Sequence, residues 1–210
     1  MRKFYSDSIY MVTTNTKNKI DYFRNTVIAD FFIDNLFSVK DLYHYKLYAF
    51  VVNLDHVHLL LKSDQSSLLK IIQSIKRNFS LNINKIMGYN EIFERKVFLK
   101  KSSKNLLTEN SNSRLINSLS EIIALDEKIK YNNDVYKSVI SRDFPKFAWR
   151  KSFHGKVVKD KETLIRTCEY IHKNPSKHGI TTNWQNYPWS SLNPEFSNMV
   201  DELPTKHLNK

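Results

Sequence analysis

The chain of 210 residues contains one cysteine, three glycines and no long apolar run. The lone cysteine, Cys168, cannot form an internal disulfide, which is typical of intracellular proteins. With so few glycines there is no glycine-rich loop of the kind that cradles nucleotide phosphates. No apolar stretch approaches the roughly 20 residues that span a bilayer, and the first residues lack the apolar core of a signal peptide. We therefore expect a cytoplasmic protein with no membrane partner.

Acidic residues are scarce relative to basic ones. The chain has 33 Lys and Arg residues against 21 Asp and Glu residues, which gives a net charge of +12 and a pI of about 9.6. Such an excess favours a polyanionic partner, because each phosphate that is neutralised releases condensed counterions. Two segments, 76–104 and 142–177, carry the excess. We expect nucleic acid in preference to an acidic membrane, since no basic amphipathic helix with an exposed aromatic face is evident.

The apolar periodicity predicts an alternation of strands and helices. Strands are expected at residues 8–16, 47–53 and 56–62, with a further strand and loop at 147–158. Helices are expected at 21–42, from Ser66 or Ser67 onwards, and at 161–174, where Pro175 should end the last helix. This order indicates an α+β fold, a small antiparallel sheet with helices on one face. Residues 102–141 are rich in Asn, Ser and Lys and contain a helical period, so we expect an insertion of unknown role within a single domain spanning 1–210.

Two histidines stand two residues apart in the third predicted strand. Successive side chains of a strand alternate between its faces, so His56 and His58 leave the same face while Val57 and Leu59 point the other way. Two neighbouring imidazoles can share one divalent ion. A His-x-His pair is also common by chance, so alone it is weak evidence for a metal site. Leu60 stands where the histidine-triad nucleotide hydrolases have a third histidine, which argues against that family.

A tyrosine lies in the last predicted helix, in the sequence EYIHKNP. Tyr170 and Asn174 are four residues apart and therefore share one helix face. A tyrosine can attack a phosphodiester and form a covalent ester that later reverses. Asn174 can offer its side-chain carbonyl to a metal. Tyr170 is one of 11 tyrosines, however, and a half-buried structural role is the simpler interpretation of that residue taken alone.

Four motifs taken together in this order resemble the REP-associated tyrosine transposases, which are insertion-sequence transposases of the single-tyrosine HUH superfamily. These motifs are DHVHLLLK, WRKSFHGKVVKDKETL, EYIHKNPSKHGI and YPWSS. The resemblance runs over most of the chain and is weakest at 102–141. It implies a ferredoxin-like α+β core with the two histidines on a central strand.

The resemblance also implies a mechanism. Proteins similar to this one bind Mg²⁺ or Mn²⁺ through the histidine pair and a polar residue one turn after the tyrosine, which here gives His56, His58 and Asn174. Tyr170 would attack the DNA and form a 5′-phosphotyrosine with a free 3′-hydroxyl. Such proteins recognise hairpins in single-stranded DNA, and some are homodimers that exchange the tyrosine helix. Asp55 stands where asparagine is usual, and we expect it to point away from the metal face or to sit in the turn, with little effect.

Basic, histidine and aromatic residues near the tyrosine helix are candidates for supporting roles at this site. Basic side chains near the tyrosine helix are candidates for binding DNA, although each taken alone is a solvated surface charge: Arg150, Lys151, Lys156, Arg166, Lys173 and Lys177. His154 and His172 are candidates for an accessory role in proton transfer. Aromatic residues of this region can stack on unpaired bases, but we expect Tyr187 and Trp189 to be core residues. Cys168 lies on the apolar stripe and is expected to be buried.

The sequence therefore predicts a metal-dependent transposase that cuts and joins single-stranded DNA. Two other functions stay open. One is a domesticated, non-catalytic module that binds nucleic acid with the same fold and basic surface. The other is a metal-dependent phosphodiesterase that uses water in place of Tyr170 as the nucleophile.

Overall fold

The computed structural model describes residues 7–63, 67–89 and 144–204. The chain divides into two compact units, one formed by Met1–Ser80 with Phe147–Lys210 and the other by Leu81–Lys146. All the candidate site residues lie in the first unit. The expected insertion at 102–141 lies outside the described residues, so its limits and the single-domain organisation stay predictions. Within the described ranges no helix has the length and apolar character to cross a membrane.

Four strands form one antiparallel sheet. Their bounds are β1 Ile9–Asn15, β2 Lys46–Val52, β3 His56–Lys62 and β4 His154–Val158. The order across the sheet is β2-β3-β1-β4, and every neighbouring pair is antiparallel. The first three strands start and end within one residue of their predicted limits, because their β-branched and aromatic runs are bounded by polar turns.

Three α-helices are described, besides short 3-10 helices. They are α1 Thr26–Tyr43, α2 Leu68–Ile86 and α5 Lys161–Lys177. The α1 helix begins later than predicted because the Asn25 side chain accepts from the amides of Val27 and Ile28 and caps it. The Ser67 hydroxyl accepts from the Lys70 amide at the start of α2, as predicted. The order β1-α1-β2-β3-α2-β4 with β1 and β3 in the centre is ferredoxin-like, which confirms the predicted fold class.

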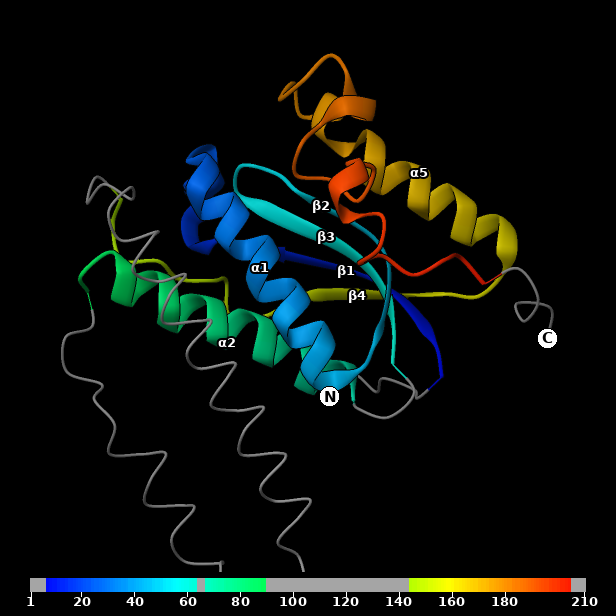
Figure 1. Ribbon diagram of the computed structural model, residues 1–210, viewed down its shortest axis with the longest axis horizontal. Helices are drawn as coiled ribbons and strands as arrows, with labels where there is room; N and C mark the ends of the chain where they lie inside the picture. Colours follow the sequence, from blue (N-terminus) through cyan, green and yellow to red (C-terminus); the bar gives the residue numbers. More distant parts are fainter. Residues whose placement is uncertain (1–6, 64–66, 90–143, 205–210) are drawn as a thin grey trace, which may run out of the picture. The chain divides into compact units, whose positions relative to one another are not determined.

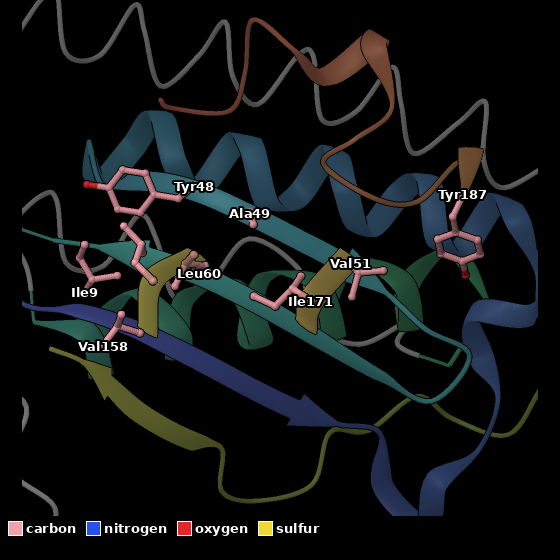
Figure 2. Close-up of a cluster of buried hydrophobic side chains, with 9 residues drawn as sticks. Ile9, Tyr48, Ala49, Val51, Leu60, Val158, Ile171 and Tyr187 are labelled. Carbon is pink, nitrogen blue, oxygen red and sulfur yellow. The ribbon is translucent and has the colours of Figure 1, made fainter. Parts of the chain in front are cut away.

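Helices cover both faces of the sheet, so the prediction of helices on one face is wrong (Figure 1). On one face Phe50 of β2 contacts Phe37 of α1, and α1 in turn contacts α2 through Phe32 and Phe79. On the other face α5 packs Leu164 and Ile171 against Leu60 and other apolar residues of the sheet (Figure 2). The physical reason is that β2 and β3 are buried along nearly their whole length, which requires apolar cover on both sides.

The α5 helix continues to Lys177, so the prediction that Pro175 ends it is wrong. A proline in the last turn removes only one backbone donor, and the following amides still bond: His178 N–H donates to Asn174 O (3.1 Å) and Ile180 N–H to Pro175 O (2.9 Å). Gly179 at φ +66° ends the helix, because glycine adopts this left-handed conformation without steric cost. The extra turn carries Lys177 and His178 towards the histidine pair.

The C-terminal segment lies along the edge of β2. The Val52 amide donates to the Trp189 carbonyl (2.9 Å), and the Tyr187 hydroxyl donates to the Val52 carbonyl (2.9 Å). Burial raises the pKa of the Tyr187 phenol to about 12. Trp189 is half-buried and its indole donates to Asp30 (2.8 Å). Tyr187 and Trp189 are thus packing residues, as predicted, and they protect an otherwise open sheet edge.

Candidate active site

The two predicted histidines lie at the start of β3, side by side on the face that α5 covers. Their ring centroids are 5.0 Å apart, and both side chains are buried. His58 pairs with Thr13 of β1, which in turn pairs with His154 of β4. The site therefore occupies the end of the sheet where β1 finishes and β3 and β4 begin.

Each imidazole is held through its Nδ1 atom. His56 Nδ1 donates to Asp55 Oδ1 (2.5 Å), and His58 Nδ1 hydrogen-bonds with the Thr13 hydroxyl (2.8 Å). A partner at Nδ1 fixes each ring. Because the Asp55 carboxylate can only accept, His56 Nδ1 carries the proton and Nε2 keeps the lone pair that a metal ion needs. Of the two positions expected for Asp55, the structure shows the one in the turn, where its contact with His56 was not expected. Asp55 ends the tight connection between β2 and β3, and from there its carboxylate reaches the adjacent ring.

Asn174 comes to the histidine pair from α5, as predicted. The side chain is fully buried, and its Oδ1 lies 3.2 Å from His56 Nε2. Asn53, at the end of β2, was not singled out from the sequence. Its Nδ2 donates to Asn174 Oδ1 (2.9 Å) and lies 3.2 Å from His56 Nε2. The signal available in the sequence was an asparagine at the end of a predicted strand, directly before the two-residue connection to the histidine strand.

Burial lowers the pKa of His58 to about 3, with further contributions from His56 and His178, while a hydrogen bond with Asn174 opposes the shift. The imidazole is therefore neutral at physiological pH. Neutral imidazole is the form that binds a metal ion.

Tyr170 lies next to the histidine pair of the same chain. Its ring centroid is 5.6 Å from that of His58, in an edge-on arrangement, and the side chain is 38% exposed. The Lys177 ammonium stands 4.4 Å from the centre of the tyrosine ring. A late helix and an early strand thus bring the phenol, the imidazoles and a cation together, and the phenol remains open to solvent.

His178, which follows α5 directly, is a site residue that sequence reasoning missed. Its ring centroid is 4.8 Å from that of His56. Partial burial, followed by the neighbouring His56, lowers its pKa, while Asp55 acts in the opposite sense. The helix predicted from the sequence ended before Pro175, so His178 was not placed near the residues of its face.

The donor atoms fit a hard divalent cation. Among the described residues there is no group of three or more His, Cys, Asp or Glu side chains arranged to hold a metal. Beside the two imidazoles lies the amide oxygen of Asn174, and amide oxygens suit Mg²⁺ and Mn²⁺. Two buried polar atoms here have no hydrogen-bond partner, Asn174 Nδ2 and Asn53 Oδ1.

The predicted basic residues do not gather at one place. Lys177 lies at Tyr170, whereas Arg166 and Lys173 form ion pairs with Glu162 and Glu169 on the exposed side of α5. Lys156 is exposed on β4. Arg150 and Lys151 line a groove of about 1040 Å³ together with His154.

Most of the groove is lined by α2 and by the segment that precedes β4. Thr13, which hydrogen-bonds with His58, is one of its lining residues. A second recess of about 680 Å³ shares Arg150 and Lys151 and adds Lys17 and Lys19. No acidic residue lines either cavity within the described ranges. The two recesses thus form one basic surface around Arg150 and Lys151.

The segment that carries these basic residues is fixed by Lys76 of α2. The Lys76 ammonium donates to the carbonyls of Arg150 (2.8 Å) and Ser152 (3.5 Å), and burial lowers its pKa. Its own carbonyl accepts from the Trp149 indole (3.1 Å), and that indole ring packs on Phe79. Trp149 is therefore a packing residue that holds the segment in place.

His172 does not point to the site. Its Nε2 hydrogen-bonds with the Ser191 hydroxyl (2.9 Å), and its Nδ1 lies 3.8 Å from Cys168 Sγ. Burial lowers the pKa of His172 to about 4 and raises that of the Cys168 thiol to about 11. Both residues belong to the packing of α5, and an accessory role for His172 has no contact to support it.

Comparison with known proteins bears on this arrangement. Residues 4–102 match the family model described as "Transposase IS200 like". The chain is similar to the IS200-like transposases. The matched span includes His56 and His58 and ends before Tyr170. The resemblance predicted from the sequence motifs is confirmed, and this IS200-like character supports a transposase role.

One solved structure agrees in fold. The structure of a REP-associated tyrosine transposase bound to a REP hairpin is similar with a TM-score of 0.58 and 13% identity, over 96% of this chain and 86% of that chain. A protein from Deinococcus radiodurans R1 to which a transposase function is assigned matches with a TM-score of 0.43 and 16% identity, over 81% of this chain and 93% of that chain. No curated protein matches the sequence.

Proposed function

We propose that this protein cuts and rejoins single-stranded DNA, with Tyr170 as the nucleophile. The observation that supports this most strongly is the position of Tyr170, whose ring is 5.6 Å from that of His58. Its partner on the same helix face, Asn174, reaches the same histidine pair. A purely structural tyrosine has no need of a solvent-open position beside two buried imidazoles and a lysine.

The proposed reaction is a transesterification. The Tyr170 oxygen loses its proton and forms a bond to phosphorus, while the bond between phosphorus and the 3′-oxygen breaks. The departing 3′-oxygen takes up a proton, and the DNA remains attached to Tyr170 through a 5′-phosphate. Attack by a 3′-hydroxyl reverses these changes and joins two strands. The number of phosphoester bonds is unchanged at each step, so no external energy source is required.

His56, His58 and Asn174 are proposed to hold Mg²⁺ or Mn²⁺. Such an ion, when bound, offsets the negative charge that develops on the phosphate during attack. Asp55 and Thr13 keep the two imidazoles oriented. Lys177 is suited to bind the phosphate that Tyr170 attacks.

A DNA hairpin is the proposed substrate. The similar REP-associated transposase has been solved bound to a REP hairpin, and the net charge of +12 favours a polyanion. The basic surface around Arg150 and Lys151 is proposed to bind the strand next to the site. A dimer that exchanges α5 is not required for the chemistry, because Tyr170 already lies beside His58 of its own chain.

The direct test uses single-stranded hairpin oligonucleotides with Mn²⁺ and gel detection of a protein–DNA adduct. The wild-type chain should form the adduct, and Tyr170→Phe should abolish it while binding persists. Tyr43→Phe is a matched control, since Tyr43 is half-buried and its hydroxyl bonds Ser74 away from the site (2.8 Å). An adduct in Tyr170→Phe would contradict the choice of nucleophile.

Two other outcomes would identify the alternative functions. Salt-sensitive binding with no cleavage of any hairpin would favour a non-catalytic nucleic-acid module. Cleavage without an adduct, retained in Tyr170→Phe, would favour a phosphodiesterase that uses water.

A further inference from the structure

Asn53 is a buried amide with one side unsatisfied. It directly follows β2, and its backbone N–H donates to the His56 carbonyl (2.8 Å), which closes the connection to β3. The side chain is fully buried, and its Oδ1 has no hydrogen-bond partner. An unpaired buried carbonyl costs free energy, so the present orientation of this amide is not its most stable one once another partner is available.

Three polar atoms form a nearly equilateral triangle at this point. Asn53 Nδ2 is 2.9 Å from Asn174 Oδ1 and 3.2 Å from His56 Nε2, and the last two atoms are 3.2 Å apart. In an octahedral site with ligand distances of about 2.1 Å, neighbouring ligands are about 3.0 Å apart. The triangle therefore has the size of one face of an octahedral Mg²⁺ or Mn²⁺ site.

The atom at the third corner is a donor in the metal-free chain. Asn53 Nδ2 donates to the lone pairs of Asn174 Oδ1 and His56 Nε2, which are the lone pairs that a metal ion would need. Rotation of the Asn53 amide by half a turn exchanges Nδ2 for Oδ1. Two carbonyl oxygens at such a distance repel each other, but a cation bound to both removes that repulsion. The rotation gives the buried Oδ1 the ion as a partner and moves Nδ2 to the position that Oδ1 now occupies, so the bond to the ion must offset the hydrogen bonds that Nδ2 gives up.

We propose that Asn53 is a further direct ligand of the divalent ion, through Oδ1 after rotation of its amide. This proposal rests on the metal site of the proposed function. The ligand set becomes two imidazole nitrogens and two amide oxygens, all neutral, so the ion keeps its full charge for the phosphate. Two oxygens in the set favour Mg²⁺ and Mn²⁺ over metals that prefer nitrogen and sulfur.

The test is Mn²⁺ binding to the purified full chain, measured by titration calorimetry without DNA. Asn53→Ala should weaken Mn²⁺ binding by about tenfold or more, because a ligand is lost. A loss of binding through misplacement of Asn174 is separated from loss of a ligand by the ¹³C measurement described below. If Asn53 Nδ2 only competes with the ion for lone pairs, Asn53→Ala leaves Mn²⁺ binding equal or tighter. That result would overturn the proposal.

His56→Ala and His58→Ala separate this proposal from the proposed function. Each should remove Mn²⁺ binding. If both variants bind Mn²⁺ as the wild type does, the metal site itself is wrong. If both lose binding while Asn53→Ala retains it, only the role of Asn53 fails.

An isosteric variant covers the case in which Asn53→Ala does not fold. Wild type and Asn53→Asp are labelled with ¹³Cγ-asparagine and compared by pulsed electron paramagnetic resonance of bound Mn²⁺. Two asparagine carbonyls bind the ion in the wild type and one in Asn53→Asp, so the intensity of the ¹³C coupling signal should fall by about half in the variant. An unchanged ¹³C coupling would show that Asn53 does not bind the ion.

Discussion

At the scale of single residues, the two histidines of the site are oriented by different kinds of partner. His56 uses the carboxylate of its neighbour Asp55, and His58 uses a hydroxyl from the adjacent strand, that of Thr13. The first partner is local in sequence and the second depends on the register of β1 with β3. In both cases the partner engages Nδ1 and fixes the ring.

Asp55 provides a prediction about ring orientation. Asp55→Ala removes the acceptor at His56 Nδ1 and should weaken Mn²⁺ binding by about 10- to 100-fold. Asp55→Asn keeps an acceptor oxygen and should retain most of the affinity. Calorimetric titration of both variants measures the effect. Equal affinities in wild type and Asp55→Ala would mean that the hydrogen bond does not orient the ligand.

His172 provides a prediction about acid stability. Its pKa is lowered to about 4 by burial, so the unfolded chain binds a proton below about pH 6.5 while the folded chain does not. Above pH 6.5 the imidazole is neutral in both states and His172 causes no loss of stability. As pH falls from 6.5 towards 4, the free energy of unfolding decreases by at most about 1.4 kcal/mol per pH unit because of this residue.

Urea unfolding at pH 7 and pH 5 measures this loss. His172→Gln does not titrate and keeps a group that can bond Ser191, so it should lose less stability than the wild type between the two pH values. A variant that loses as much as the wild type would assign the acid sensitivity to other groups.

The chemistry-bearing residues could be found in the sequence because their spacing alone places them together. Alternation along a strand puts His56 and His58 on one face, and the helical repeat puts Tyr170 and Asn174 on one face. Asn53 and His178 could not be found in that way. Their proximity to His56 depends on how the β2–β3 connection closes and how far α5 continues, and neither is a periodic property.

At the scale of the element, residues 147–153, which precede β4, determine where the basic charge of Arg150 and Lys151 lies. Lys76 binds the carbonyls of Arg150 and Ser152, so the backbone is fixed while the Arg150 and Lys151 side chains stay exposed. On α5 the charges of Arg166 and Lys173 are instead paired within their own helix. Pairs of this kind are exposed and contribute little.

This difference predicts which cations bind DNA. Arg150→Gln and Lys151→Gln should each lower the slope of log affinity against log salt by roughly 0.7, the value for one lost contact with a single-stranded phosphate. Arg166→Gln is the matched control and should leave the slope unchanged. Filter binding of a hairpin oligonucleotide over a salt series measures all three. A loss of slope in Arg166→Gln equal to that in Lys151→Gln would mean that the strand lies elsewhere.

The limits of the elements show what local sequence decides and what it does not. Strand bounds were predictable because each run of apolar residues stops at a polar connection. The start of α1 depended on the Asn25 cap, and the end of α5 on Gly179 and not on Pro175. A proline near a helix end costs one hydrogen bond, which the tertiary packing of α5 outweighs.

At the scale of the whole molecule, helices pack on both faces of the sheet. The site lies on the face that α5 covers, where the sequence predicted no helix. The alternation in β3 indicated an apolar face and a histidine face, and the histidine face was expected to be open. Leu60 and the apolar residues of β2 instead continue that face, and α5 covers it. This cover is what brings Tyr170 to His58, because a helix that packs on Leu60 necessarily passes the histidines next to it.

The central claim is therefore a chemical bond to one named residue. The most direct measurement is mass spectrometry of peptides from the protein–DNA adduct formed with a single-stranded hairpin and Mn²⁺. A peptide that contains Tyr170 should carry a nucleotide joined through a 5′-phosphate. A nucleotide on any other residue, or complete cleavage of the hairpin with no modified peptide, would contradict the account.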